Sequence, residues 1–255
     1  MNYGFRLLFV LFFLSGCKQE AVIEFTSSYF SEEELELCNN EPCSQVSIEY
    51  QVAKGDESIA AAINEKIEWY IIASLFLGDD DAPSAKTIHA AATEFILAYR
   101  DHQPDLPSNL DLGGYDAEVN IYHAFQNESI VSLEMYAYLF TGGAHGYGAT
   151  SFLLFDLKTG EGMEARSLFT DLAGFAAYAE RKFKEEHEIT EDASINSTGF
   201  WFEDDQFYLP DTMGFSEDKF VLLFNPYEIA SYAAGAIRLE IPIEEITPYL
   251  DTEFL

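Results

Sequence analysis

The stretch VNIYHAFQNESIVSLEMYAYLF, residues 119–140, contains two runs of alternating residues separated by the turn-forming pair Asn127-Glu128. The alternating positions are Val119, Ile121, His123 and Phe125, then Val131, Leu133, Met135, Ala137 and Leu139. Such alternation is typical of half-buried strands, because successive side chains point to opposite faces of a sheet. The stretch therefore predicts an antiparallel hairpin with one face on a core and polar residues on the other.

Shorter patterns on both sides of this hairpin predict further strands and three longer helices. The strands are expected at residues 46–52, 152–157, 207–209, 220–224 and 237–241. The helices are expected to begin after Asp56, at Ser84, and after Thr170 or Asp171, where apolar residues recur on one helical face. This combination predicts an α+β fold with antiparallel sheets, helices packed on one face, and two intertwined subdomains.

Changes in composition divide the chain into four expected parts. Their bounds are 1–16 for a lipoprotein signal peptide, 17–44 for a lipidated tether with the Cys38–Cys43 loop, 45–112 for an amino-terminal α/β subdomain and 113–255 for a carboxy-terminal α+β subdomain. The joint between the two subdomains is indicated by the loop-forming residues Pro104, Pro107 and Gly113-Gly114.

The start of the chain is typical of a bacterial lipoprotein. One basic residue, Arg6, precedes an apolar run from Leu7 to Leu14, and Ser15-Gly16 then leads to Cys17. The run is too short to span a bilayer and indicates a cleaved signal, after which Cys17 would carry lipid. The alternative is a plain signal peptide with an incidental cysteine. Lys18 after the cysteine favours the outer membrane, with the periplasmic or surface face left open.

The chain is strongly acidic, with 45 Asp and Glu against 13 Lys and Arg and a net charge of −32. Such a charge excludes nucleic acid as a partner, because phosphates would be repelled. It favours a cationic partner, although solubility or adaptation to salt or cold also explains it. Hydrophobic residues make up 48% of the chain, so a sizeable folded core is expected.

Two cysteines remain after Cys17. Cys38 and Cys43 flank a short segment with a proline, and an even pair in an oxidising envelope predicts a local disulfide. A zinc site would need more Cys or His residues nearby, so no metal is expected here.

A glycine-rich loop is the candidate binding site: Thr141, Gly142, Gly143, Ala144, His145 and Gly146. Glycines after a strand allow a close approach of the backbone to a ligand or simply a tight crossing. His145 is a candidate base, ligand or structural histidine, and the structural role is the simpler interpretation, since no partner at ligand spacing is visible. The known nucleophile, phosphate-loop and metal motifs are missing, so we expect no catalytic residue and no cofactor.

Several later segments occur with this loop in a familiar order. They are Phe155–Gly160, Ser167-Leu168-Phe169, Phe207-Tyr208-Leu209, Gly214-Phe215 and Asn225–Gly235. Together they resemble the domain-of-unknown-function 3298 family, preceded by a part that resembles the 4163 family. The resemblance covers about residues 45–250, and it makes Tyr227, Glu228, Tyr232 and Gly235 a candidate family motif. The chain departs from the usual family pattern in having Ser231 where proline is common.

The same pair of domains occurs in the extracytoplasmic part of the lysozyme-sensing anti-sigma factor RsiV and beside the catalytic domain of PdaC-type peptidoglycan deacetylases. The resemblance therefore implies an α+β ligand-binding or sensory module and does not imply catalysis. We expect a membrane-anchored envelope lipoprotein that binds a cationic, lysozyme-like protein or cell-wall material. The alternatives are a cell-wall-modifying hydrolase or deacetylase and a purely structural lipoprotein.

Overall fold

The structure, a computed structural model, describes residues 22–39, 43–80, 82–102 and 114–254. The expected signal peptide and Cys17 lie outside these residues. The strands are β1 (Glu24–Ser31), β2 (Gln45–Lys54), β3 (Asp116–Gln126), β4 (Ile130–Phe140), β5 (Tyr147–Asp156), β6 (Gly162–Met163), β7 (Met213–Ser216), β8 (Lys219–Phe224) and β9 (Ile237–Pro242). The α-helices are α1 (Glu57–Ser74), α2 (Ile88–His102), α3 (Leu172–Glu186) and α4 (Ile243–Ile246).

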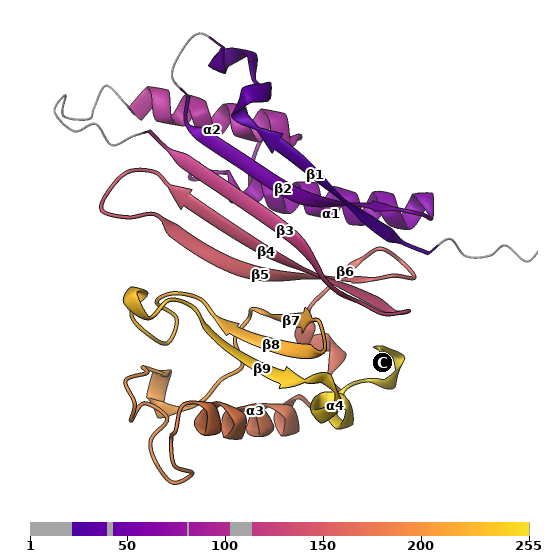
Figure 1. The fold of residues 1–255 in the computed structure, drawn as a ribbon, viewed down its shortest axis with the longest axis vertical. Helices are drawn as coiled ribbons and strands as arrows, with labels where there is room; N and C mark the ends of the chain where they lie inside the picture. The colour runs from indigo at the N-terminus through magenta and orange to yellow at the C-terminus, as the bar shows by residue number, and fades with distance from the viewer. Residues whose placement is uncertain (1–21, 40–42, 81, 103–113, 255) are drawn as a thin grey trace, which may run out of the picture.

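Two sheets lie between two layers of helices (Figure 1). The first sheet has six strands in the order β1-β2-β3-β4-β5-β6, and the second has three in the order β7-β8-β9. The predicted α+β class is confirmed, but one pair is not antiparallel as predicted. Strand β3 runs parallel to β2, because α1 and α2 lie between them in the chain and return it to the same end of the sheet.

The predicted hairpin is present as β3 and β4, with Val119 opposite Ala137. The turn is held by Asn127, whose side-chain Oδ1 accepts hydrogen bonds from the backbone N–H groups of Ser129 and Ile130 at 2.8 and 2.9 Å. The register shifts between His123 and Phe125, which marks a β-bulge. The extra residue reverses the alternation, so Phe125 packs in a different core from Val119.

The first core lies between the six-stranded sheet and the helices α1 and α2, which cover one of its faces. Helix α1 begins as predicted after Asp56, whose carboxylate accepts hydrogen bonds from the N–H groups of Ser58 and Ile59. Helix α2 begins at Ile88, later than the predicted start at Ser84. Its first turn is held by Thr87, whose hydroxyl accepts a hydrogen bond from the Ala90 N–H.

The second core lies between the three-stranded sheet, α3 and part of the other face of the large sheet. Strand β7, which the sequence did not predict, packs against β3, β4 and β5. Phe215 of β7 stacks on Phe125 at 5.0 Å, and its N–H donates to the buried hydroxyl of Ser132. Residues 207–209 were predicted as a strand, but they form an extended segment without strand pairing.

The first described segment corrects the prediction of a tether over residues 17–44. Residues Glu24–Ser31 form β1, an edge strand that pairs antiparallel with β2. Ile23, Phe30 and Leu35 are buried in the first core. Burial of these apolar side chains stabilises a segment that was predicted to be a tether.

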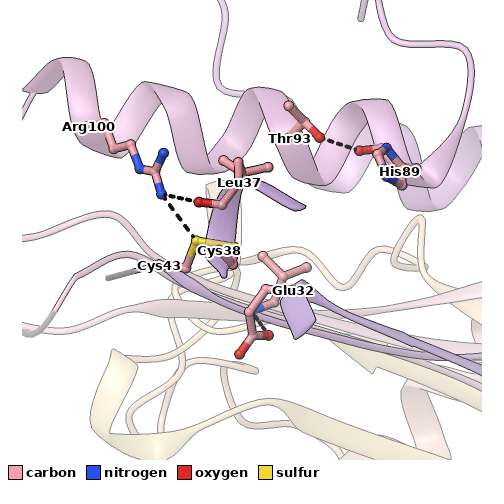
Figure 2. Close-up of a disulfide and its surroundings, with 8 residues drawn as sticks. Glu32, Leu37, Cys38, Cys43, His89, Thr93 and Arg100 are labelled. Atoms are coloured by element: carbon pink, nitrogen blue, oxygen red, sulfur yellow. Dashed lines mark hydrogen bonds between the residues drawn. A yellow bond between two sulfur atoms is a disulfide. The ribbon is translucent and has the colours of Figure 1, made fainter. Parts of the chain in front are cut away.

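The predicted disulfide between Cys38 and Cys43 is present, with Cα atoms 5.5 Å apart. It packs beside α2, where the Arg100 guanidinium donates to the Leu37 carbonyl at 2.9 Å and to Cys43 Sγ at 3.4 Å (Figure 2). The short segment after β1 is thereby attached to the helical layer.

The subdomain boundary expected between residues 112 and 113 lies outside the described residues. The strands on its two sides, β2 and β3, are neighbours in one sheet, so the two predicted subdomains share that sheet. The described residues contain no helix that is long and apolar enough to cross a membrane.

Candidate functional site

The candidate binding loop connects β4 to β5 at one end of the six-stranded sheet. Gly142 and Gly143 have φ values of 98° and 96°, a conformation that glycine adopts without strain. His145 is exposed, and its Nδ1 lies 2.9 Å from the Gly146 carbonyl oxygen. Since a carbonyl only accepts, Nδ1 is the donor in this contact.

The candidate family motif meets this loop from the other half of the chain. The Tyr232 ring stacks on the His145 ring, with centroids 4.3 Å apart and planes 20° from parallel. The Tyr227 ring also stacks on Tyr232, with centroids 5.4 Å apart. We call these three rings, His145, Tyr232 and Tyr227, the aromatic row. The structure thus brings together two segments that the sequence identified separately.

Two contacts attach the segment that carries Tyr227 and Tyr232 to the loop and to the start of β5. The Tyr232 hydroxyl donates to the Gly146 carbonyl at 3.1 Å. The Tyr147 hydroxyl lies 3.5 Å from the Pro226 carbonyl, which is at the limit for a hydrogen bond. Tyr227 has a φ of 73°, which is rare for a residue with a side chain, and this backbone turn leaves its ring 53% exposed.

Asn225 positions the motif on β5. Its Oδ1 accepts a hydrogen bond from the Thr150 N–H at 2.8 Å, and its Nδ2 donates to the Thr150 carbonyl at 3.0 Å. The side-chain amide thereby makes the two bonds that a neighbouring strand would make. The backbone N–H of Asn225 donates to Glu228 Oε2 at 2.9 Å, which closes the turn around Tyr227.

Glu228 therefore has a structural contact rather than a free carboxylate. Burial raises the pKa of Glu228, the hydrogen bond from Asn225 opposes this, and the charge of Asp211 adds to the rise. The last motif residue, Gly235, has a φ of 72° and ends the short 3₁₀ turn that carries Tyr232.

Tyrosines of β4 extend the aromatic surface, although they were not predicted to belong to the site. A Cβ atom at Gly146 would collide with the Tyr138 ring, and one at Gly148 would collide with the Tyr136 ring. The two glycines of the loop and of β5 therefore allow both rings to lie across the neighbouring strand. The signal was present in the sequence, because Tyr136 and Tyr138 fall on the polar face of the predicted hairpin.

The other side of the loop borders a hollow of about 390 Å³, lined by Thr141, Gly142, His145, Leu77 and Leu139 among others. Its apolar lining suits an apolar side chain. His145 makes no hydrogen bond to a carboxylate, and the described residues include no group of three or more His, Cys, Asp or Glu placed to hold a metal ion. The arrangement presents rings and glycines, the groups of a recognition surface.

Comparison with family models matches residues 167–244 to the protein of unknown function DUF3298 and residues 37–147 to deacetylase PdaC. No curated protein matches the sequence significantly. The aromatic row therefore joins the two matched regions, since His145 belongs to the second match and both tyrosines to the first.

Solved structures share the fold. A crystal structure of a DUF3298 family member from Bacteroides fragilis is 18% identical, with a TM-score of 0.66, and covers 92% of this chain and 96% of its own. A DUF3298 family protein from Pseudomonas aeruginosa PAO1 is 16% identical, with a TM-score of 0.60 and the same coverages. The matches support a domain of unknown function. The chain thus combines an amino-terminal part similar to PdaC with a carboxy-terminal part similar to DUF3298, in the fold of solved DUF3298 proteins.

Proposed function

We propose that this protein is a lipid-anchored module of the cell envelope that binds a cationic protein and has no catalytic activity of its own. The observation that carries the proposal is the exposed aromatic row on a chain with a net charge of −32. Exposed tyrosines are enriched at binding surfaces, because they bury large area with few rotatable bonds. The acidic charge selects partners of the opposite sign and speeds their encounter.

The test is binding of hen lysozyme, a small cationic protein of the kind that the family resemblance suggests. The immobilised chain (residues 18–255) is expected to bind lysozyme at low salt and to lose most of that binding at high salt, because exposed charges are screened. An acidic protein of similar size is the control and is expected not to bind. Absence of lysozyme binding at low salt would contradict the lysozyme version of the proposal, and salt-independent binding would contradict its electrostatic basis.

The name of the PdaC match keeps a cell-wall deacetylase or hydrolase as the alternative. That function would place His145 and neighbouring acids in an active site, whereas the His145 ring is stacked on Tyr232 and its Nδ1 contacts a backbone carbonyl. Incubation with peptidoglycan is therefore expected to release neither acetate nor muropeptides. Release that disappears in His145→Ala would establish the enzyme instead.

Anchoring through Cys17 would place the module close to the membrane. The described residues begin at Val22, and Ile23 is held by Gln126, whose Nε2 donates to the Ile23 carbonyl at 2.9 Å. Five residue steps from Cys17 to Val22 span at most about 18 Å. The candidate loop follows β4, an 11-residue strand of about 35 Å that leads away from this end (Figure 1). The aromatic row would therefore lie at the end of the sheet that is away from the lipid.

Replacing Cys17 with serine is expected to move the full-length protein from the membrane fraction to the soluble fraction, because the lipid attachment is lost. Labelling with radioactive palmitate is expected to disappear in the same variant. The control is Cys38→Ser/Cys43→Ser, which removes the disulfide and is expected to stay membrane-bound and labelled. Membrane retention of the Cys17 variant would refute the lipid anchor.

A further inference from the structure

One face of the six-stranded sheet is only partly covered. The helices α1 and α2 cover the opposite face. The three-stranded sheet covers part of this face, where β7 packs against β3, β4 and β5. The uncovered part lies on β1 to β4, and we call it the open face. Its residues are Tyr29, Glu49, Glu118, Asn120, Tyr122, Tyr136 and Tyr138.

The strand register shows that these side chains are neighbours. Tyr29 lies opposite Glu49, which lies beside Asn120, which lies opposite Tyr136. This row crosses four strands and spans about 14 Å, because adjacent strands are about 4.8 Å apart. On either side of it along β3, Glu118 lies opposite Tyr138 and Tyr122 lies opposite Glu134. Directly paired residues point to the same side of a sheet.

The chemistry of this face is unusual for a solvated sheet surface, which normally mixes charges of both signs. On the strands β1 to β4, the positions of this face carry mostly tyrosine, acidic, amide and serine residues, with Phe140 at the end of β4, and no lysine or arginine. Arg238 of β9 pairs with Glu134 at 2.7 Å at the border of the face. Glu118 accepts a hydrogen bond from the Asn120 side-chain amide at 2.6 Å, and neither Glu49 nor Glu118 forms a salt bridge within the described part of the chain.

The tyrosines are accessible and lie next to these acids. Tyr29 is 61% exposed, Tyr122 48% and Tyr136 37%. Partial burial raises the pKa of Tyr122, and the charges of Glu49 and Glu118 raise it further. The same two causes, burial and then Glu118, raise the pKa of Tyr136. The rings and carboxylates thus share one electrostatic environment.

The open face continues into the aromatic row. The pKa of Tyr136 responds, after burial and Glu118, to Tyr138 and Tyr232. The Tyr138 ring covers Gly146, and the Gly146 carbonyl accepts the hydrogen bond from Tyr232. A single surface therefore runs from Tyr29 on the edge strand to Tyr227 in the second half of the chain, wide enough to meet a folded partner.

We propose that the open face, together with the aromatic row, is the docking surface for a folded cationic protein, whose lysine and arginine side chains lie on the tyrosine rings that flank Glu49 and Glu118. This inference rests on the proposed function and names its surface. A cation over a tyrosine ring within about 6 Å is attracted by the ring, and a carboxylate at its side adds a charge pair. A second copy of this chain does not fit, since two surfaces with unpaired carboxylates repel each other.

The test uses two variants of the soluble chain (residues 18–255) and one matched control. Glu49→Gln/Glu118→Gln removes two charges and keeps the shapes, and Tyr122→Ser/Tyr136→Ser removes two rings and keeps the charge. The control, Glu185→Gln/Glu186→Gln, also removes two negative charges, but from the exposed end of α3, on the far side of the three-stranded sheet (Figure 1). Hen lysozyme and a basic peptide rich in lysine and arginine are the probes, and thermal melting verifies that each variant is folded.

At low salt each open-face variant is expected to bind lysozyme about five- to tenfold more weakly than the original chain, because each variant removes two surface contacts with the partner. The control is expected to change binding less than twofold. The loss in the tyrosine variant is expected to persist at high salt, because ring contacts are not screened as charges are.

The outcomes separate this inference from the proposed function. If the original chain binds lysozyme and both open-face variants bind as well as it does, the docking surface is elsewhere and the proposed function stands. If the α3 control weakens binding as much as the open-face variants, net charge alone causes binding and the inference is wrong. If the original chain binds neither lysozyme nor the basic peptide at low salt, both proposals fall.

Discussion

Replacing Phe183 with alanine is expected to lower the free energy of unfolding by about 3–5 kcal/mol. Phe183 lies on α3 and is fully buried. The centroid of its ring lies within 6.0 Å of the ring centroids of Phe200, Phe202, Phe207 and Phe224. It joins the helix to β8 and to the irregular segment after α3. Truncation would leave a cavity that four rigid rings cannot fill, which adds to the lost transfer free energy.

Urea denaturation followed by circular dichroism measures this change. Phe183→Leu is a graded variant that keeps most of the volume and is expected to cost less than about 1.5 kcal/mol. Trp69→Ala is the control for an exposed aromatic, since Trp69 is 51% exposed on α1, and it is expected to cost less than about 1 kcal/mol. A loss below about 1 kcal/mol for Phe183→Ala would show that the second core is less tightly packed than the structure indicates.

The sequence predicted those elements whose signals are local. The β3–β4 hairpin was predicted because its alternation extends over residues 119–140 and a turn-forming pair interrupts it. Helices α1 and α3 were predicted because Asp56 and Asp171 cap them and apolar residues follow at helical spacing. The disulfide was predicted because Cys38 and Cys43 are close in sequence.

Features that depend on distant partners were not predicted. Strand β1 has few apolar residues, and its pairing is provided by β2, which follows the disulfide loop. The parallel pairing of β2 with β3 depends on the return of the chain through α1 and α2. The bulge after His123 reverses the alternation without a glycine or proline to mark it.

The candidate site was predicted in parts. The loop 141–146 and the motif 227–235 were both identified, but their stacking depends on the way β5 and Asn225 bring the two matched regions together. Phe202 is buried, whereas the neighbouring Trp201 is exposed. The exposure of the open face was not predictable, because it is set by how far the small sheet extends.

Replacing Asn225 with alanine is expected to lower the free energy of unfolding by about 2–3 kcal/mol, because the half-buried Thr150 N–H would lose its partner and the Thr150 carbonyl would keep only the longer hydrogen bond from the Thr212 hydroxyl at 3.4 Å. The turn that carries Tyr227 and Tyr232 would also lose its attachment to β5. Lysozyme binding is therefore expected to weaken together with stability. Urea denaturation and the lysozyme binding assay measure the two effects on the same preparation.

The chain offers a matched control in Asn64 of α1, which makes the same pair of hydrogen bonds to another strand. Its Oδ1 accepts from the Ala53 N–H at 2.8 Å and its Nδ2 donates to the Ala53 carbonyl at 3.0 Å. Asn64→Ala is expected to cost about as much stability as Asn225→Ala and to leave lysozyme binding within twofold, since Ala53 lies on the core side of β2. If both variants lose binding equally, binding follows global stability. Loss in Asn225→Ala alone would show that the aromatic row must be fixed on β5 for the partner to bind.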